Sequence, residues 1–249
     1  MNIKSNYIKP KFKKESNPKV GLLALSTDLT IERDFNSICH KLPLDIFVNR
    51  IHNENPLTKE NLLKMYDQIE LITEKILPGE KISTIAYACT SGTIAIGEDR
   101  VKEKIQLAKP GCQVTTPITS AIKAFKKMNI KKIAVFTPYP ESVNNTISEY
   151  LIKKNINVTS FSTFNLDLDV DFARIDPKYL SEILIKLNIK DADALFVSCT
   201  ALPALEIIDG VESKINKPVF SSNQTLIWDT LRSVGYKNSI KGYGKLLRN

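Results

Sequence analysis

The stretch ISTIAYACTSGT, residues 82–93, decides the fold together with a second stretch, ADALFVSCTALP, residues 192–203. Each begins with a short apolar run typical of a buried strand, continues into a cysteine and ends where a helix is expected. The two cysteines, Cys89 and Cys199, therefore occupy equivalent positions 110 residues apart. This spacing indicates that one structural unit occurs twice along the chain.

The same repeat is visible on either side of these stretches. The segment KVGLLALSTD, which begins at Lys19, matches KIAVFTPYP, which begins at Lys132. Likewise KPGCQVTTPITSAIKAF, from Lys109, matches NKPVFSSNQTLIWDTL, from Asn216. Apolar segments predict strands at residues 20–25, 45–49, 84–88, 113–115, 132–137, 157–162, 194–198 and 218–221. Helical patterns fall between them, at residues 58–76, 120–128, 140–153, 177–187 and 223–234.

Strands that alternate with helices predict an α/β fold with parallel sheets covered by helices. We expect two pseudo-symmetric lobes, each a four-stranded parallel sheet flanked by helices, with the active site in the cleft between them. Ligands bind at the carboxyl ends of parallel strands, and these ends would face one another across that cleft. The predicted units are a basic tail at 1–18, an N-terminal lobe at 19–117 plus 224–249, and a C-terminal lobe at 118–223.

The positive charge of the chain is concentrated at its N-terminus. The formal net charge is +8, and residues 1–19 carry six lysines and one glutamate. A short lysine-rich tail is by itself a weak signal for nucleic-acid binding. We therefore expect residues 1–18 to form a solvated, disordered tail, and we expect no nucleic-acid partner.

The sequence shows no sign of a membrane segment. No apolar run approaches the roughly 20 residues needed to cross a bilayer. The lysine-rich N-terminus also lacks the apolar stretch of a secretory signal. The expected location is the cytoplasm, without a membrane partner.

Cofactor and metal chemistry find little support in the sequence. Cysteines occur at positions 39, 89, 112 and 199, and none forms a C-x-x-C pair. The two histidines, His40 and His52, make a histidine-based metal site or a Ser–His–Asp triad hard to build. The glycine-rich motif G-x-x-x-x-G-K-[ST] of ATP-binding proteins does not occur, and no G-x-G-x-x-G motif of NAD-binding proteins follows a strand. We expect no metal and no cofactor.

Cys89 and Cys199 are the candidate catalytic residues. Each lies between a strand and a helix, where unpaired N–H groups lower a thiol pKa and hold anions. Thr90 and Ser91 add hydroxyl donors beside the first thiol, and Thr200 does so beside the second. These three hydroxyl residues are therefore candidates for substrate binding.

A cysteine after a buried strand is most often a small core residue, and we interpret Cys39 and Cys112 as structural. Cys89 and Cys199 occupy equivalent positions in a duplicated chain, which favours a functional interpretation for these two cysteines. Two opposed thiols can invert a carbon next to a carboxylate, one removing a proton and the other delivering one from the opposite face. Alternatively, one thiolate adds to an activated alkene, the former double bond rotates, and elimination gives the trans isomer.

Several motifs point together to one family. The most specific are the two cysteine motifs, ACTSGT and SCTALPALEIID, and the segment SSNQTLIWDTLR. Supporting motifs are STDLTIERDF, NRIHNENPLTKENLLKM, TPYPESVN and GYGKLL. From Lys19 to the C-terminus, the chain resembles the Asp/Glu racemase superfamily, in the branch of maleate cis–trans isomerase, arylmalonate decarboxylase and the ectoine-utilisation protein A group.

The resemblance implies a role for each matching residue. Cys89 would be the nucleophile, and Cys199 would be the acid or base of the second half. Thr90 and Ser91 would hold the substrate carboxylate, and Tyr139 would place its hydroxyl in the same pocket. Arylmalonate decarboxylases keep only the second cysteine, so the pair favours isomerase or racemase chemistry over decarboxylation.

Two positions depart from the maleate enzymes of this branch. Where those enzymes carry asparagines, this chain has Asp28 and, by a less direct match, Asp169. An ionised carboxylate beside a bound dicarboxylate would repel it. Asp28 can also serve as the cap of a helix that follows it. If both acids line the pocket, a substrate with an ammonium or hydroxyl group fits better than maleate.

The sequence thus predicts a cofactor-independent isomerase of a small carboxylate that uses two opposed cysteines. Two alternatives stay open. One is a racemase acting on an amino-acid-like intermediate, as in ectoine utilisation. The other is a non-catalytic protein that binds a small carboxylate. The expected partner is a small carboxylate in each case, and a homo-oligomer is compatible with the sequence.

Overall fold

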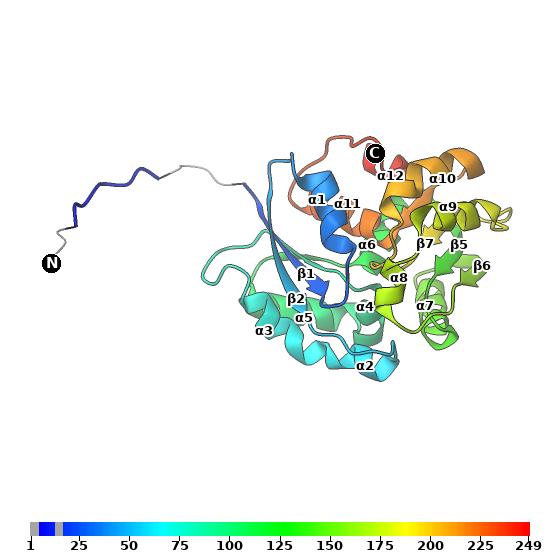
Figure 1. The fold of residues 1–249 in the computed structure, drawn as a ribbon, viewed down its shortest axis with the longest axis horizontal. Coiled ribbons are helices and arrows are strands. Elements are labelled where there is room, and N and C mark those ends of the chain that lie inside the picture. The colour runs from blue at the N-terminus through cyan, green and yellow to red at the C-terminus, as the bar shows by residue number, and fades with distance from the viewer. Residues whose placement is uncertain (1–4, 13–16) are drawn as a thin grey trace.

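The computed structural model describes residues 5–12 and 17–249. Parts of the predicted tail, residues 1–4 and 13–16, lie outside the described residues. Residues 5–12 form no helix or strand and are exposed, extending away from the folded part (Figure 1). Within the described ranges, no helix is both long and apolar enough to cross a membrane.

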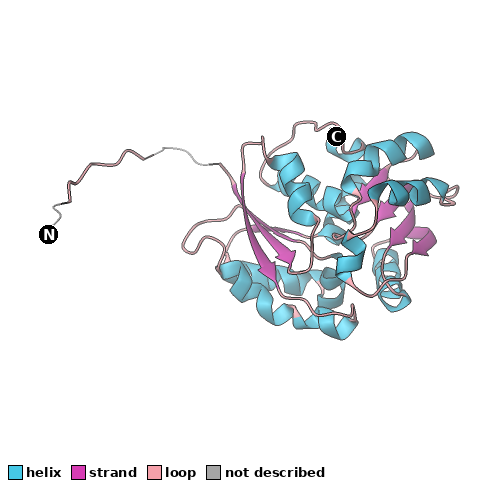
Figure 2. Cartoon of the chain, in the orientation of Figure 1, coloured by secondary structure: helices cyan, strands magenta, loops and turns pink. Residues whose placement is uncertain are grey.

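Two four-stranded sheets form the framework, and every described strand pairing in them is parallel. The first sheet has the order β2-β1-β3-β4, and the second has the order β6-β5-β7-β8. The strands of the first sheet are β1 (Lys19–Leu25), β2 (Asp45–Ile51), β3 (Thr84–Tyr87) and β4 (Gln113–Thr115). Those of the second are β5 (Lys132–Thr137), β6 (Asn157–Thr163), β7 (Ala194–Val197) and β8 (Val219–Ser221). The equivalent strand order in both sheets confirms the predicted fold class. Figure 2 shows the strands with helices around them.

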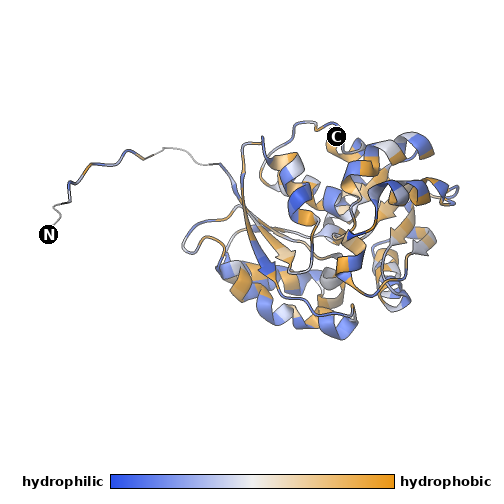
Figure 3. Cartoon of the chain, viewed as in Figure 1, coloured by the Kyte–Doolittle hydropathy of each residue, from blue (hydrophilic) through white to orange (hydrophobic). Residues whose placement is uncertain are grey.

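Helices flank both sheets. They are α1 (Ile31–Cys39), α2 (Lys59–Lys64), α3 (Tyr66–Glu74), α4 (Thr90–Ile96), α5 (Glu98–Ala108), α6 (Pro117–Lys127) and α7 (Glu141–Lys153). The series continues with α8 (Asp169–Ala173), α9 (Pro177–Lys186), α10 (Ile208–Ile215), α11 (Ser222–Ser233) and α12 (Lys245–Arg248), with a 3₁₀ turn at Leu205–Ile207. Most helix ribbons alternate between hydrophilic and hydrophobic residues in Figure 3, as expected of helices with one buried face.

The boundaries of the predicted helices differ from the structure by more than one residue at two places. The segment predicted as one helix over 58–76 is divided into α2 and α3, with a turn at the fully buried Met65. The hydrophobic pattern runs through this turn without a break, so periodicity alone could not locate it. Helix α6 begins three residues earlier than predicted, at Pro117, because the fixed φ of proline suits the first helical position.

Helix α11 lies at the junction of the two sheets. It packs along α6 and contacts β3 and β4 of the first sheet and β8 of the second. Its residues from Ser222 to Leu231 are all buried, although most of them are polar, so their side chains need partners inside the protein. The division into lobes at 19–117 plus 224–249 and at 118–223 stays a prediction, because α11 contacts strands of both sheets.

Candidate active site

The first thiol lies at the start of α4. Strand β3 ends at Tyr87, and Cys89 occupies the N-cap of α4 in an extended conformation. Its Sγ accepts a hydrogen bond of 3.2 Å from the backbone N–H of Gly92. The thiol therefore replaces the hydroxyl or carboxylate that usually caps a helix, and it is aimed at the N–H groups of the first turn.

Gly92 makes this close approach possible. A Cβ atom at this position would lie 2.7 Å from the Cys89 Sγ and 2.6 Å from the Met65 Cε. We expect Gly92→Ala to displace the thiol and, for the isomerase that the sequence predicts, to lower kcat about tenfold, because small displacements of reacting groups are costly. Steady-state kinetics would measure this loss.

Gly210→Ala is the matched control, because Gly210 is also in a helix and a Cβ there meets nothing within 4 Å. Equal losses of activity in the two variants would contradict the proposed role of Gly92.

The second thiol lies at the corresponding point of the second sheet. Strand β7 ends at Val197, and Cys199 follows two residues later. The Tyr139 hydroxyl and the backbone N–H of Ala201 lie close enough to its Sγ to lower the pKa of Cys199. Tyr139 follows β5 and is buried, with its ring edge-on to Phe172 at a centroid distance of 5.7 Å. A rigid aromatic side chain thus presents the hydroxyl to this thiol.

The Tyr139 hydroxyl lowers the pKa of Cys199 by stabilising the thiolate. Removing it in Tyr139→Phe is expected to raise that pKa. At a fixed pH, alkylation of Cys199 by iodoacetamide should then slow by up to about tenfold, the equivalent of about 1.4 kcal/mol for one hydrogen bond. Mass spectrometry of the two cysteine peptides across a pH series would measure both rates.

Tyr150→Phe provides the control, since the Tyr150 hydroxyl donates at 2.6 Å to Glu98, at the start of α5, and not to a thiol. If both variants leave the pH profile of Cys199 unchanged, the tyrosine hydroxyl does not tune this thiol.

The two cysteine-bearing segments meet. The Thr200 hydroxyl donates to the carbonyl of Ala88 at 3.4 Å, so each cysteine is next to a residue in contact with the other segment. Thr30, which precedes α1, also donates to the carbonyl of Ala201 at 2.8 Å. The structure therefore brings the segments of Cys89 and Cys199 into contact, and Tyr139 lies near both thiols.

Burial dominates the ionisation of both thiols. Cys89 is 2% exposed and Cys199 is 3% exposed. Burial raises the pKa of Cys89 to about 12, although the Gly92 N–H works in the opposite direction. Burial also raises the pKa of Cys199, against the effect of Tyr139. The N–H groups at the helix start lower the thiol pKa, as expected, but desolvation raises it by more.

Two buried carboxyl groups lie beside the thiols. Asp28 accepts hydrogen bonds at Oδ1 from the backbone N–H groups of Thr30 and Ile31, at 2.7 and 2.9 Å, and so caps the start of α1. Its buried Oδ2 has no hydrogen-bond partner among the described residues, although the Thr200 hydroxyl is close enough to lower the pKa of Asp28. Asp28 thus combines the capping role with a free oxygen near the thiols, whose pKa values its charge helps to raise.

Asp169 reaches the same region from the start of α8. Its Oδ2 accepts hydrogen bonds from the Thr27 hydroxyl at 2.9 Å and from the Asn53 side chain at 2.7 Å. Burial raises the pKa of Asp28 and of Asp169, and the charge of Asp28 raises the pKa of Asp169 further. Arg50 lowers the pKa of Asp28, but this is the smallest of the contributions. The site therefore concentrates acidic groups without a cation of comparable effect.

The remaining candidates from the sequence lie around the first thiol. The Thr90 hydroxyl is 2.9 Å from that of Ser222, at the start of α11. The Ser91 hydroxyl lies 3.9 Å from the Cys89 Sγ. Sequence reasoning did not single out Asn53 or Ser222, although both lie in motifs that carry the family resemblance. Their contacts join residues more than a hundred positions apart, which no local pattern encodes.

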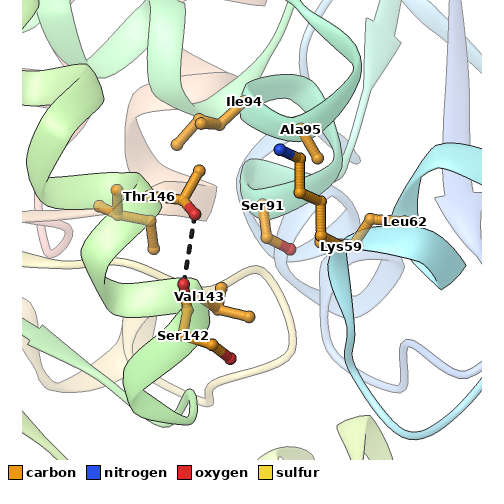
Figure 4. A pocket seen from close by; sticks show the side chains of 9 residues that line it. Lys59, Leu62, Ser91, Ile94, Ala95, Ser142, Val143 and Thr146 are labelled. Atoms are coloured by element: carbon orange, nitrogen blue, oxygen red, sulfur yellow. Dashed lines mark hydrogen bonds between the residues drawn. The ribbon is translucent and has the colours of Figure 1, made fainter.

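A cavity of about 160 Å³ adjoins the site through Ser91 (Figure 4). It lies between α2, α4 and α7, and its walls are mostly apolar, with Ile94 and Val143 among them. Lys59, exposed on α2, also lines it, as does Thr146, whose hydroxyl donates to the Ser142 carbonyl at 3.2 Å. Both thiols themselves are buried and do not line this cavity.

Two like sheets that meet at a pair of buried thiols define a duplicated α/β protein with a two-cysteine site. The match of a family model to residues 73–247 then shows that the chain belongs to the arylmalonate decarboxylase family. A curated relative, maleate isomerase of Geobacillus stearothermophilus, is 26% identical over 245 residues, covering 92% of this chain and 96% of the relative.

Solved structures share the fold. The maleate isomerase from Pseudomonas putida S16 has a TM-score of 0.86 at 21% identity, covering 94% of this chain and 99% of that chain. A cysteine-to-serine mutant of the Nocardia farcinica maleate cis–trans isomerase, with a covalently bound succinylcysteine intermediate, has a TM-score of 0.85 at 19% identity. That match covers 94% of this chain and 99% of that one. The predicted family is confirmed, and the predicted isomerase function agrees with these comparisons.

Proposed function

We propose that the protein is a cofactor-independent isomerase of a small carboxylate, with Cys89 and Cys199 as its catalytic residues. The observation that carries the proposal is the contact between the two cysteine segments, through Thr200 and the Ala88 carbonyl. Two buried thiols follow equivalent strand ends. Cys89 accepts a hydrogen bond from the Gly92 N–H, and the Tyr139 hydroxyl lies close enough to Cys199 to favour its thiolate. Relatives named as maleate isomerases support the same class of reaction.

For a cis–trans isomerisation, the Cys89 thiolate forms a C–S bond to one alkene carbon. The neighbouring carbon takes the proton of the Cys199 thiol, so the double bond becomes a single bond that can rotate. The Cys199 thiolate then removes that proton, the double bond re-forms, and Cys89 leaves as thiolate. The reaction is balanced by the two sulfur atoms and one proton, so it requires no oxidant and no cofactor.

The substrate carboxylate needs donors that hold its developing charge. The N–H groups at the start of α4 and the hydroxyls of Thr90 and Ser91 are suited to one carboxylate. Thr200 and Tyr139 offer hydroxyls from the second half of the chain. The Thr90 hydroxyl is hydrogen-bonded to that of Ser222 and the Thr200 hydroxyl to the Ala88 carbonyl, so a bound carboxylate would replace these internal hydrogen bonds.

A racemase acting on an amino-acid-like substrate is a second candidate, and the pair Asp28 and Asp169 favours it. Among the described residues the Oδ2 of Asp28 lacks a donor, and an ammonium group would supply one. Such a group would also relieve the repulsion between the two acids. In this reaction one thiolate removes the proton next to the carboxylate, and the other thiol delivers a proton from the opposite face.

Proton NMR with the purified full-length protein separates these candidates. Conversion of maleate to fumarate without added cofactor would support the isomerase. Exchange of the Cα proton of an amino acid in heavy water would support the racemase. If a panel of small carboxylates gives thermal shifts but neither reaction, the protein is a binding protein and the proposal is wrong.

The proposal also includes the setting of the reaction. It places the enzyme in the cytoplasm, with a small carboxylate as its partner and without a nucleic-acid or membrane partner. A homo-oligomer is compatible with it, and light scattering would measure the assembly state.

A further inference from the structure

Asp34 is a buried carboxyl group that the proposed reaction does not use. It lies in the first turn of α1. Its Oδ2 accepts a hydrogen bond of 2.7 Å from the side-chain N–H group of Asn223, a residue 189 positions away in the sequence. This contact links α1 directly to α11.

Asn223 uses both of its side-chain N–H groups. The second one donates to the carbonyl of Thr200 at 2.8 Å, while its Oδ1 is buried without a partner among the described residues. Rotating the amide by half a turn would place Oδ1 against acceptors, the Asp34 carboxylate and the Thr200 carbonyl. Asp34 and the Thr200 carbonyl therefore fix the amide orientation together, and the bond to Asp34 is strongest when its carboxyl group is ionised.

The residue held in this way directly follows the second thiol. Thr30, just before α1, binds the next carbonyl, that of Ala201, at 2.8 Å. The backbone after Cys199 is thus anchored at two successive carbonyl groups, one by Thr30 and one by Asn223. Resting on the proposed function, we infer that Asp34 is a positioning residue for Cys199, acting through Asn223.

The surroundings of Asp34 make this anchor sensitive to pH. Burial, together with the charges of Asp28 and Glu206, raises the pKa of Asp34 to about 7, against the effects of Asn223 and Arg33. The Arg33 Nε is 3.8 Å from Asp34 Oδ1. Asp34 also lines a surface cavity of about 210 Å³ with Arg33 and Glu206, so protons can reach it. Above this pKa the charge-assisted bond to Asn223 is at full strength, and below it the bond weakens.

Hydrogen–deuterium exchange of the full-length protein tests the inference. After correction for intrinsic exchange, the peptide that contains Cys199 should lose protection several-fold between about pH 8 and about pH 6 in the wild type. The peptide that contains Cys89 should not change. In Asp34→Asn, which keeps the shape but cannot titrate, the pH dependence should disappear. In Asp34→Leu, which removes the acceptor, protection should be low at both pH values.

Asp229→Asn is the matched control. Asp229 is a buried acid on α11, the helix of Asn223, and it binds Ser120 and Lys123 rather than the cysteine segments. This variant should keep the wild-type pH dependence. Equal protection at both pH values in the wild type would overturn the inference even if the variants fail to fold. Because exchange does not depend on turnover, this result is separate from any failure of the proposed reaction.

Discussion

Replacing Cys199 by serine is expected to slow the elimination that forms the product and to leave the substrate covalently attached to Cys89. Without the thiol that exchanges a proton with the intermediate, kcat should fall by about 10²- to 10⁴-fold. Adduct formation needs only the Cys89 sulfur and a proton from water, so the adduct can still accumulate. Intact-protein mass spectrometry after incubation with maleate would show one maleate equivalent, located on the Cys89 peptide.

Two further variants make the result specific. Cys89→Ser should form no adduct and have no isomerase activity. Cys112→Ser, which changes a buried cysteine just before β4, should behave like the wild type. Full activity in Cys89→Ser would rule out the proposed nucleophile. If the substrate is an amino acid, Cys199→Ser should instead form no adduct and should exchange the Cα proton of only one enantiomer.

Replacing Asp28 by asparagine is expected to improve the use of a dicarboxylate. The asparagine would keep an oxygen for the N–H groups of Thr30 and Ile31, while the negative charge beside the thiols would be lost. Since facing like charges cost several kcal/mol, KM for maleate should fall by about 10²-fold. Turnover of a substrate with an ammonium group should fall in the same variant.

The same substitution has an expected effect on stability, which follows from the direction of the pKa shift. Burial raises the pKa of Asp28 in the folded protein, so ionising this carboxyl costs more in the native state than in the unfolded chain. The wild type therefore loses stability as the pH rises above the unfolded pKa of the carboxyl group. Asp28→Asn removes this loss, and its melting temperature should exceed that of the wild type more at high pH than at low pH.

Asp171→Asn is the control for both effects, because the Asp171 carboxyl is partly exposed on α8, two residues after Asp169, and pairs with Arg174. An unchanged KM for maleate in Asp28→Asn would mean that this carboxyl does not set the charge preference of the site.

The duplicated fold and the position of the two cysteines at strand ends could be predicted because short stretches of sequence indicate them. An apolar strand that ends in a cysteine can be recognised from a dozen residues, and the repeat places the second copy. The position of Asp28 allowed both a capping and a pocket interpretation from the sequence, and the structure shows its two oxygens in different surroundings.

The other features of the site depend on packing between distant segments. The hydrogen bond from Asn223 to Asp34 has no counterpart in any local pattern. The ionisation of the thiols also differs from the expectation, because the sequence shows the helix start beside Cys89 but not how completely the assembled chain covers it. Desolvation is a property of the assembled fold, and here it is the largest contribution.

The buried length of α11 has a consequence for how the protein works. A helix in contact with strands of both sheets can serve as a hinge axis. The hydrogen bonds that join the two halves of the chain on the cysteine side include Thr200 to Ala88 and Thr27 to Asp169. Breaking such bonds would let the two sheets separate on the cysteine side while α11 keeps them joined. Water that enters with the substrate would reverse the desolvation of the thiols and lower their pKa. Binding of the substrate and formation of the thiolate would then occur together.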